Sequence, residues 1–116
     1  MLNGEMLEKK KEVVHHLADC VMACNHCFSS CLEEDDVKMM KDCIKLDKEC
    51  AEVCQFTIGM LHKSQFVDKY LELCIQVCEA CANECGKHNN DHCRHCAEVC
   101  KKCADTCRQF RQMFQK

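Results

Sequence analysis

The stretch CVMACNHCFSSC, residues 20–31, places four cysteines four, three and four residues apart. Spacings of three and four residues keep side chains on one face of an α-helix. Leucine and other apolar residues usually take these positions where a helix packs into a core. The stretch therefore predicts a helix whose buried face consists of thiols.

The same spacing recurs 54 residues later in CIQVCEACANEC, residues 74–85. Three further cysteines repeat with a shift of 53, which aligns Cys43, Cys50 and Cys54 with Cys96, Cys103 and Cys107. In this alignment Met40 corresponds to Cys93, and Asp47 corresponds to Cys100. The repeat indicates two similar helical hairpins in tandem.

Strong helix formers dominate the rest of the chain, which has no proline and only three glycines among its 116 residues. Short polar breaks separate four predicted helices, at about residues 4–33, 36–61, 65–86 and 90–114. Asp35 or Asp36 and then Ser64 are the expected N-caps of the second and third helices, and Gly86 the expected left-handed C′ glycine. Because short loops favour antiparallel neighbours, we predict an all-α fold. It is an antiparallel up-down-up-down four-helix bundle with a cysteine-lined core, in one domain spanning residues 1–116.

Apolar residues continue the cysteine faces of the four helices in one direction. They are Val13, Leu17, Leu61, Val67, Leu71, Phe110 and Phe114. In an antiparallel bundle these positions meet at one end, where we expect an apolar plug. The cysteines then extend toward the opposite end, beside the two hairpin loops, where we expect an opening.

The net charge of −3 arises from interspersed acidic and basic residues. No basic patch stands out, so nucleic acid is not an expected partner. No stretch has the apolar length of a secretory signal or a membrane span, which predicts a cytoplasmic protein with no membrane partner. The reducing cytoplasm would keep the thiols free.

Three chemistries use clustered cysteines. Disulfides within one helix are strained, because thiols at i and i+4 have diverging Cβ directions. Zinc usually takes four separated ligands, whereas these cysteines form continuous stripes. Cu(I) prefers thiolate and thioether ligands and tolerates two-coordinate geometry, so it suits CxxxC pairs one helical turn apart. High-capacity Cu(I) storage is the favoured function, and a zinc-binding or disulfide-stabilised structural helical bundle is the alternative. An enzyme is not expected, because no single thiol stands beside a distinct orienting pair.

The candidate Cu(I) ligands are all the cysteines, with Met40 and His92 as weaker ligands at the opening. The cysteines are Cys20, Cys24, Cys27, Cys31, Cys43, Cys50, Cys54, Cys74, Cys78, Cys81, Cys85, Cys93, Cys96, Cys100, Cys103 and Cys107. Several ions would bind per chain, from about eight if no thiolate is shared to about 16 if every thiolate bridges two ions. Met39, His88 and His95 also lie near the expected opening, and His26 flanks a cysteine stripe.

Over essentially its whole length, from CVMACNHCFSSC to CAEVCKKCADTC, the sequence resembles the bacterial copper storage proteins. These are four-helix bundles lined by CxxxC cysteines. The resemblance implies Cu(I) storage, a homotetramer and, for members without an export signal, a cytosolic location. It identifies no copper donor or acceptor. Asp47 departs from the pattern, because it occupies a position where the repeat would place a cysteine.

Overall fold

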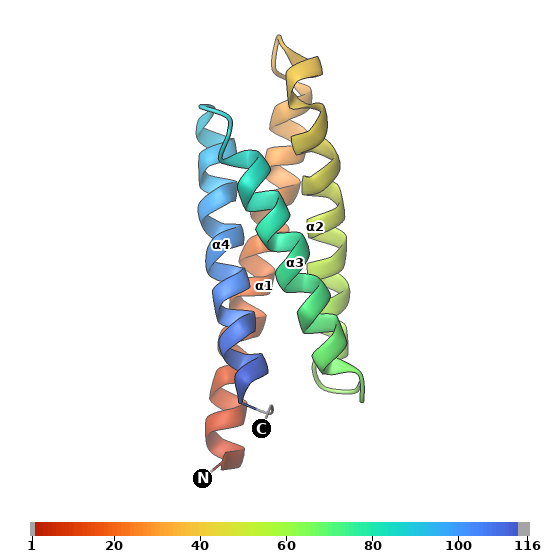
Figure 1. The fold of residues 1–116 in the computed structure, drawn as a ribbon, viewed down its shortest axis with the longest axis vertical. Coiled ribbons are helices and arrows are strands. Elements are labelled where there is room, and N and C mark those ends of the chain that lie inside the picture. The colour runs from red at the N-terminus through yellow and green to blue at the C-terminus, as the bar shows by residue number, and fades with distance from the viewer. Residues whose placement is uncertain (1, 114–116) are drawn as a thin grey trace.

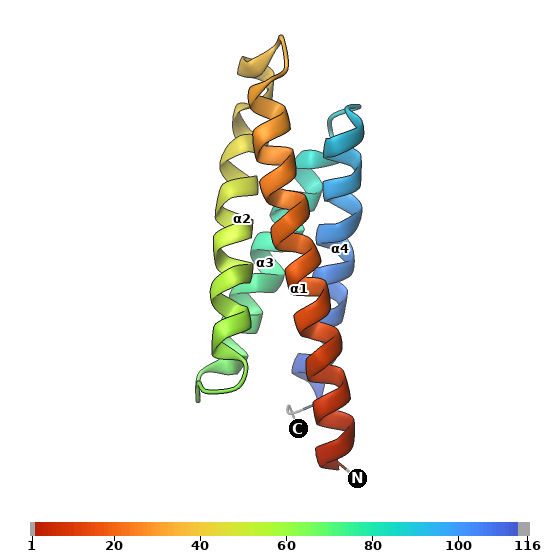
Figure 2. The ribbon, with the colours of Figure 1, turned by 180° about the vertical axis from the view of Figure 1, so that it is seen from behind.

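Four long helices form the bundle in the computed structural model, which describes residues 2–113. They are α1 (Leu2–Leu32), α2 (Lys41–Met60), α3 (Val67–Cys85) and α4 (Asp91–Gln112), and a 3₁₀ helix η1 (Val37–Met40) precedes α2. Helices α1 and α3 each pack against both α2 and α4. Figures 1 and 2 show the chain running up and down through neighbouring antiparallel helices. The predicted all-α four-helix bundle is confirmed.

The helix boundaries differ from the expected ones by a few residues. The second helix was expected to begin near residue 36, but Val37–Met40 is a 3₁₀ turn and α2 begins only at Lys41. Helix α1 already includes Leu2, and α3 begins at Val67 rather than near residue 65. Helix α4 ends at Gln112, and residue 114, its expected end, lies outside the described residues.

The expected caps are wrong in detail. Asp36 precedes η1 without a side-chain capping bond. The Ser64 hydroxyl instead accepts a hydrogen bond from the Phe66 N–H at 2.8 Å, which closes the turn before α3. Gly86 has a right-handed φ of −64° rather than a left-handed one, because its N–H still bonds to the Ala82 carbonyl at 2.9 Å. A Cβ at this glycine would lie only 3.0 Å from the same carbonyl oxygen.

The interior of the bundle has two parts. All the cysteines are fully buried, and they share one continuous core with an apolar cluster at one end. That cluster is the predicted plug, and its buried members are Val13, Leu17, Leu61, Leu71 and Phe110. Val67 is half-buried against the core, and Phe114 lies outside the described residues. The plug lies where α1 and α3 begin and α2 and α4 end, at the bottom of Figure 1.

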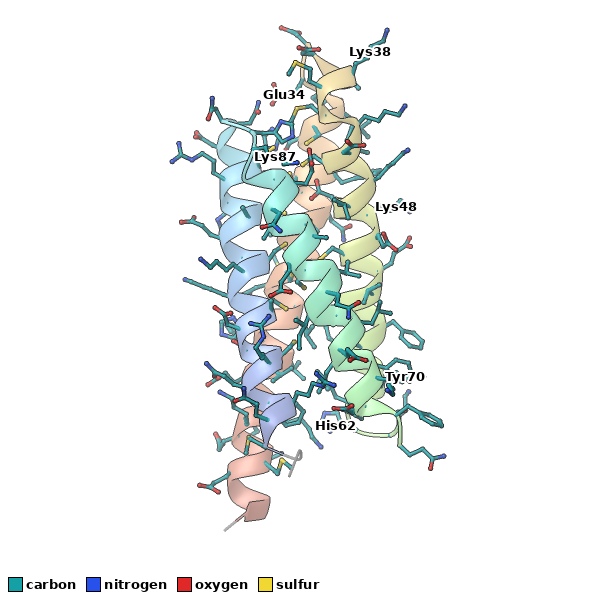
Figure 3. All side chains as sticks on the ribbon, in the orientation of Figure 1. Glu34, Lys38, Lys48, His62, Tyr70 and Lys87 are labelled. Atoms are coloured by element: carbon teal, nitrogen blue, oxygen red, sulfur yellow. The ribbon has the colours of Figure 1, made fainter. Side chains whose placement is uncertain are left out.

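The opposite end of the molecule carries the α1–η1 connection and the α3–α4 loop. We call this end the mouth, defined by residues 27–43 and 85–93. Figure 3 shows Glu34 and Lys87 here, whereas His62 and Tyr70 lie near the plug. The bundle extends over 52 × 20 × 20 Å. Within residues 2–113, no helix has the length and apolar character needed to cross a bilayer.

Asp47 is the only fully buried carboxyl group in the described residues. Its Oδ1 accepts S–H contacts from Cys81, Cys85 and Cys96, each at 3.4 Å, and its Oδ2 accepts one from Cys43 at 3.7 Å. Burial is the main cause that raises the pKa of Asp47 from 3.8 to about 10. The carboxyl group is therefore neutral in the metal-free bundle at pH 7.

Leu71→Ala tests the plug. Removing this fully buried side chain should lower the free energy of unfolding by about 2–5 kcal/mol, because it loses apolar burial and leaves a cavity. Leu73→Ala on the same helix is the matched control, since Leu73 is 47% exposed. It should change stability by less than about 0.5 kcal/mol. Urea unfolding of the reduced protein measures both, and equal losses would contradict the plug.

Asp47→Asn tests the buried carboxyl group through pH. The folded state keeps the Asp47 proton up to a pKa of about 10, whereas the unfolded chain releases it near 3.8. The folded state therefore binds more protons between these values, and the free energy of unfolding falls as pH rises, by up to about 1.4 kcal/mol per unit. Urea unfolding between about pH 5 and pH 6.5, where the thiols of the unfolded chain stay almost fully protonated, should show this slope in the wild type but not in Asp47→Asn. Asp42→Asn, an exposed change on the same helix, should keep the slope. A wild type without the slope would show that Asp47 is ionised in the fold.

Candidate metal centre

The middle of the bundle contains one thiol from each helix at nearly the same level. The Sγ atom of Cys20 on α1 lies 3.7 Å from that of Cys50 on α2, 3.9 Å from that of Cys78 on α3 and 3.6 Å from that of Cys100 on α4. The Sγ atoms of Cys50 and Cys78 are themselves 3.7 Å apart. The four helices thus bring together sulfur atoms that are 28 to 80 residues apart in sequence.

Further thiols extend this layer in both directions. Toward the plug, the Cys54 Sγ lies 3.6 Å from the Sγ atoms of both Cys74 and Cys78. Toward the mouth, the Cys24 Sγ lies 3.6 Å from that of Cys100 and 3.8 Å from that of Cys96. We call the set of 16 buried cysteines the thiol ladder. No thiol of the ladder is in a disulfide in the described residues, which include every cysteine.

The CxxxC pairs are not isolated units within the ladder. Five such pairs have Sγ atoms 3.8–4.0 Å apart: Cys20/Cys24, Cys27/Cys31, Cys50/Cys54, Cys81/Cys85 and Cys96/Cys100. Contacts between helices are equally close, and the Cys43 and Cys85 Sγ atoms approach to 3.2 Å. A soft ion could therefore bind along one helix or across two, which the sequence spacing alone did not reveal.

His92 joins three thiols at the mouth. Its Nδ1 lies 3.5 Å from the Sγ atoms of Cys27 and Cys93, and 3.9 Å from that of Cys31. Its Nε2 lies 2.7 Å from Oε2 of Glu34, in the α1–η1 connection. Because a carboxylate only accepts hydrogen bonds, the proton resides on Nε2 and the lone pair of Nδ1 faces the sulfur atoms. The structure thus brings this sequence-predicted residue into the ladder.

Burial opposes ionisation of two thiols at the mouth in the absence of metal, those of Cys31 and Cys93. Burial raises the pKa of Cys31, and the neighbouring Cys43 raises it further. Burial likewise raises the pKa of Cys93 to about 12. Metal binding here must displace protons, because the thiolate is the ligand.

The remaining candidate ligands at the mouth, Met40, Met39 and His88, differ in how exposed they are and in what they contact. Met40 is buried and Met39 is 66% exposed, and both line a surface hollow together with Glu34 and His88. His88 pairs through Nε2 with Glu84 Oε2 at 3.1 Å. The hollow brings two thioether groups and one imidazole together at the mouth.

The remaining histidine candidates lie outside the ladder. His26 and His95 are both exposed, and with Met22 they line a shallow groove between α1 and α4. Glu34, by contrast, was not singled out from sequence. It belongs to the EEDD segment, which indicates only a polar break between helices.

Comparison with known proteins places this arrangement in a family. A family model described as copper storage protein (Csp) matches residues 6–112. The uncharacterized cysteine-rich protein YhjQ of Bacillus subtilis (strain 168) is 48% identical over 63 residues, or 53% of this chain. The match spans 58% of the length of that relative.

Two solved structures share the fold. The Cu(I)-bound copper storage protein BsCsp3 from Bacillus subtilis has a TM-score of 0.84 and 42% identity, over 88% of this chain and 97% of that chain. A cytosolic copper storage protein from Streptomyces lividans, with five coppers, has a TM-score of 0.91 and 32% identity, over 94% of this chain and 97% of that chain. The chain therefore belongs to the copper storage protein family.

Proposed function

We propose that this protein stores Cu(I) on the thiolates of the ladder. The observation that carries the proposal is the density of the ladder, in which neighbouring Sγ atoms lie no more than 4.0 Å apart within a mouth cluster and within a middle cluster. The Sγ atoms of Cys24, Cys81, Cys96 and Cys100, all within 4.8 Å of one another, join the two clusters. A protein that uses one metal ion needs two to four ligands, whereas this interior contains 16 buried thiols. The match to a family of copper storage proteins supports the same function.

Cu(I) fits this interior better than harder ions. It is soft, binds thiolate strongly and accepts low coordination numbers. Several sulfur atoms, such as those of Cys20, Cys27 and Cys50, have neighbours both on their own helix and on adjacent helices, so their thiolates can bridge two ions. The proposed ligand set is that predicted from sequence: the 16 cysteines, with Met40 and His92 at the entry.

Loading would begin at the mouth. Met40 and His92 offer ligands that hold Cu(I) less strongly than thiolate does, which suits capture and transfer. The ion then exchanges between neighbouring thiolates. Each thiol releases its proton as it binds, so charge does not accumulate in the buried interior.

We further propose that the chain is a single domain that acts in the cytoplasm without catalysis. The S. lividans relative, named as a cytosolic copper storage protein, supports the location. The net charge of −3 without a basic patch supports a function that involves neither nucleic acid nor a membrane surface. Resemblance to the copper storage family supports a homotetramer.

Anaerobic titration of the reduced protein with Cu(I), against a competing chromophoric chelator, tests storage. We expect the chain to withdraw between about 8 and about 16 ions from the chelator before it saturates. Thiol counting on the same preparation should first give close to 16 free thiols, which would exclude a disulfide-stabilised bundle. Saturation at one ion or fewer per chain would refute storage.

A further inference from the structure

The four ligand atoms at the mouth have the dimensions of a tetrahedral zinc site. Zinc binds sulfur at about 2.3 Å and imidazole nitrogen at about 2.0–2.1 Å, so a tetrahedron has S···S edges of about 3.8 Å and S···N edges of about 3.5 Å. Among Cys27, Cys31 and Cys93, the three Sγ···Sγ distances are 3.8, 3.8 and 3.9 Å. The three distances from these atoms to His92 Nδ1 are 3.5, 3.5 and 3.9 Å. All six edges match to within about 0.4 Å.

A carboxylate supports the imidazole ligand in the way that zinc sites require. Metal-bound histidines almost always donate their second ring N–H to a carboxylate or carbonyl, which fixes the tautomer and the ring orientation. Glu34 Oε2 accepts from His92 Nε2 at 2.7 Å, and the His92 side chain is only 13% exposed. Three thiolates and one imidazole, with a carboxylate behind the imidazole, form a closed structural zinc set.

Charge favours the mouth over the interior for a divalent ion. Zinc with three thiolates and a neutral imidazole carries a net charge of −1, whereas zinc with four thiolates carries −2. An interior tetrad such as Cys20, Cys24, Cys50 and Cys100 is fully buried. No lysine or arginine of the described residues is buried, so nothing in the interior would offset the larger charge.

We propose that the copper-free protein binds one Zn²⁺ ion at the mouth through Cys27, Cys31, Cys93 and His92, and that incoming Cu(I) displaces it. The ion would join α1 to α4, two helices that no loop connects directly. It would hold the mouth closed and its thiols coordinated until copper arrives. Zinc binding at this site does not depend on the storage capacity of the interior, so the two proposals can fail separately.

The test uses the full-length reduced protein under anaerobic conditions, with Zn²⁺ and with Co²⁺ as its spectroscopic substitute. One equivalent of Co²⁺ should give the visible bands of a tetrahedral site with three thiolates and one nitrogen, and Zn²⁺ should remove them. Glu34→Gln should weaken zinc binding about 10- to 100-fold, because a neutral amide oxygen is a weaker acceptor for the His92 Nε2–H than the carboxylate. His92→Ala should weaken it further and alter the Co²⁺ spectrum.

His88→Ala is the matched control. Like His92, His88 has a 13% exposed side chain and an Nε2 contact to a glutamate. Unlike His92, it has no thiol within hydrogen-bonding distance in the described residues, so zinc binding should be unchanged. Circular dichroism checks that each variant folds. If His92→Ala does not fold, Glu34→Gln still tests the site.

Two results would overturn the proposal. Wild-type zinc affinity in His92→Ala, or an all-thiolate Co²⁺ spectrum in the wild-type protein, would place the ion in the interior instead. Displacement is measured by adding Cu(I) to the zinc-loaded protein with a chromophoric zinc chelator present. Release of one Zn²⁺ per chain is expected, and zinc retained while the chain fills with copper would refute displacement.

Discussion

The sulfur–sulfur contacts between the four helices are the interactions on which the interior depends. Helical spacing turns every cysteine inward, and the inward positions of four adjacent helices converge on a common axis. Small side chains let the helices approach closely enough for each sulfur atom to meet others on neighbouring helices. A leucine core would bury more apolar surface but would leave no ligands in the interior.

The interior therefore separates stability from metal binding along its length. The plug residues Val13, Leu17 and Leu71 are fully buried and supply conventional apolar packing at one end. The thiol ladder contributes less apolar area per residue, yet it extends through the rest of the bundle. Because the plug supplies ordinary apolar packing, the bundle can contain 16 cysteines without a disulfide among its described residues.

Much of this arrangement could be predicted from sequence, because its periodic part is encoded locally. The 4-3-4 spacing predicted the helices and their buried face, and the apolar residues that continue the cysteine faces predicted the plug and the mouth. Contacts between helices could not be read in the same way, because they depend on relative height and rotation. The partnership of Glu34 with His92 and the approach of Cys43 to Cys85 both arise from helix packing. The wrong N-cap predictions at Asp36 and Ser64 have a local cause instead, because several nearby polar residues could each begin a helix.

The complete burial of the ladder has a consequence for how a loaded protein is recognised. If each Cu(I) takes the place of one thiol proton, filling the interior resembles the action of an ion exchanger and leaves the total charge unchanged. The outer helix faces would then look the same to another protein whether the bundle is empty or full. Any partner that distinguishes a full bundle from an empty one would have to read that difference at the mouth, where His92 and Glu34 remain partly exposed.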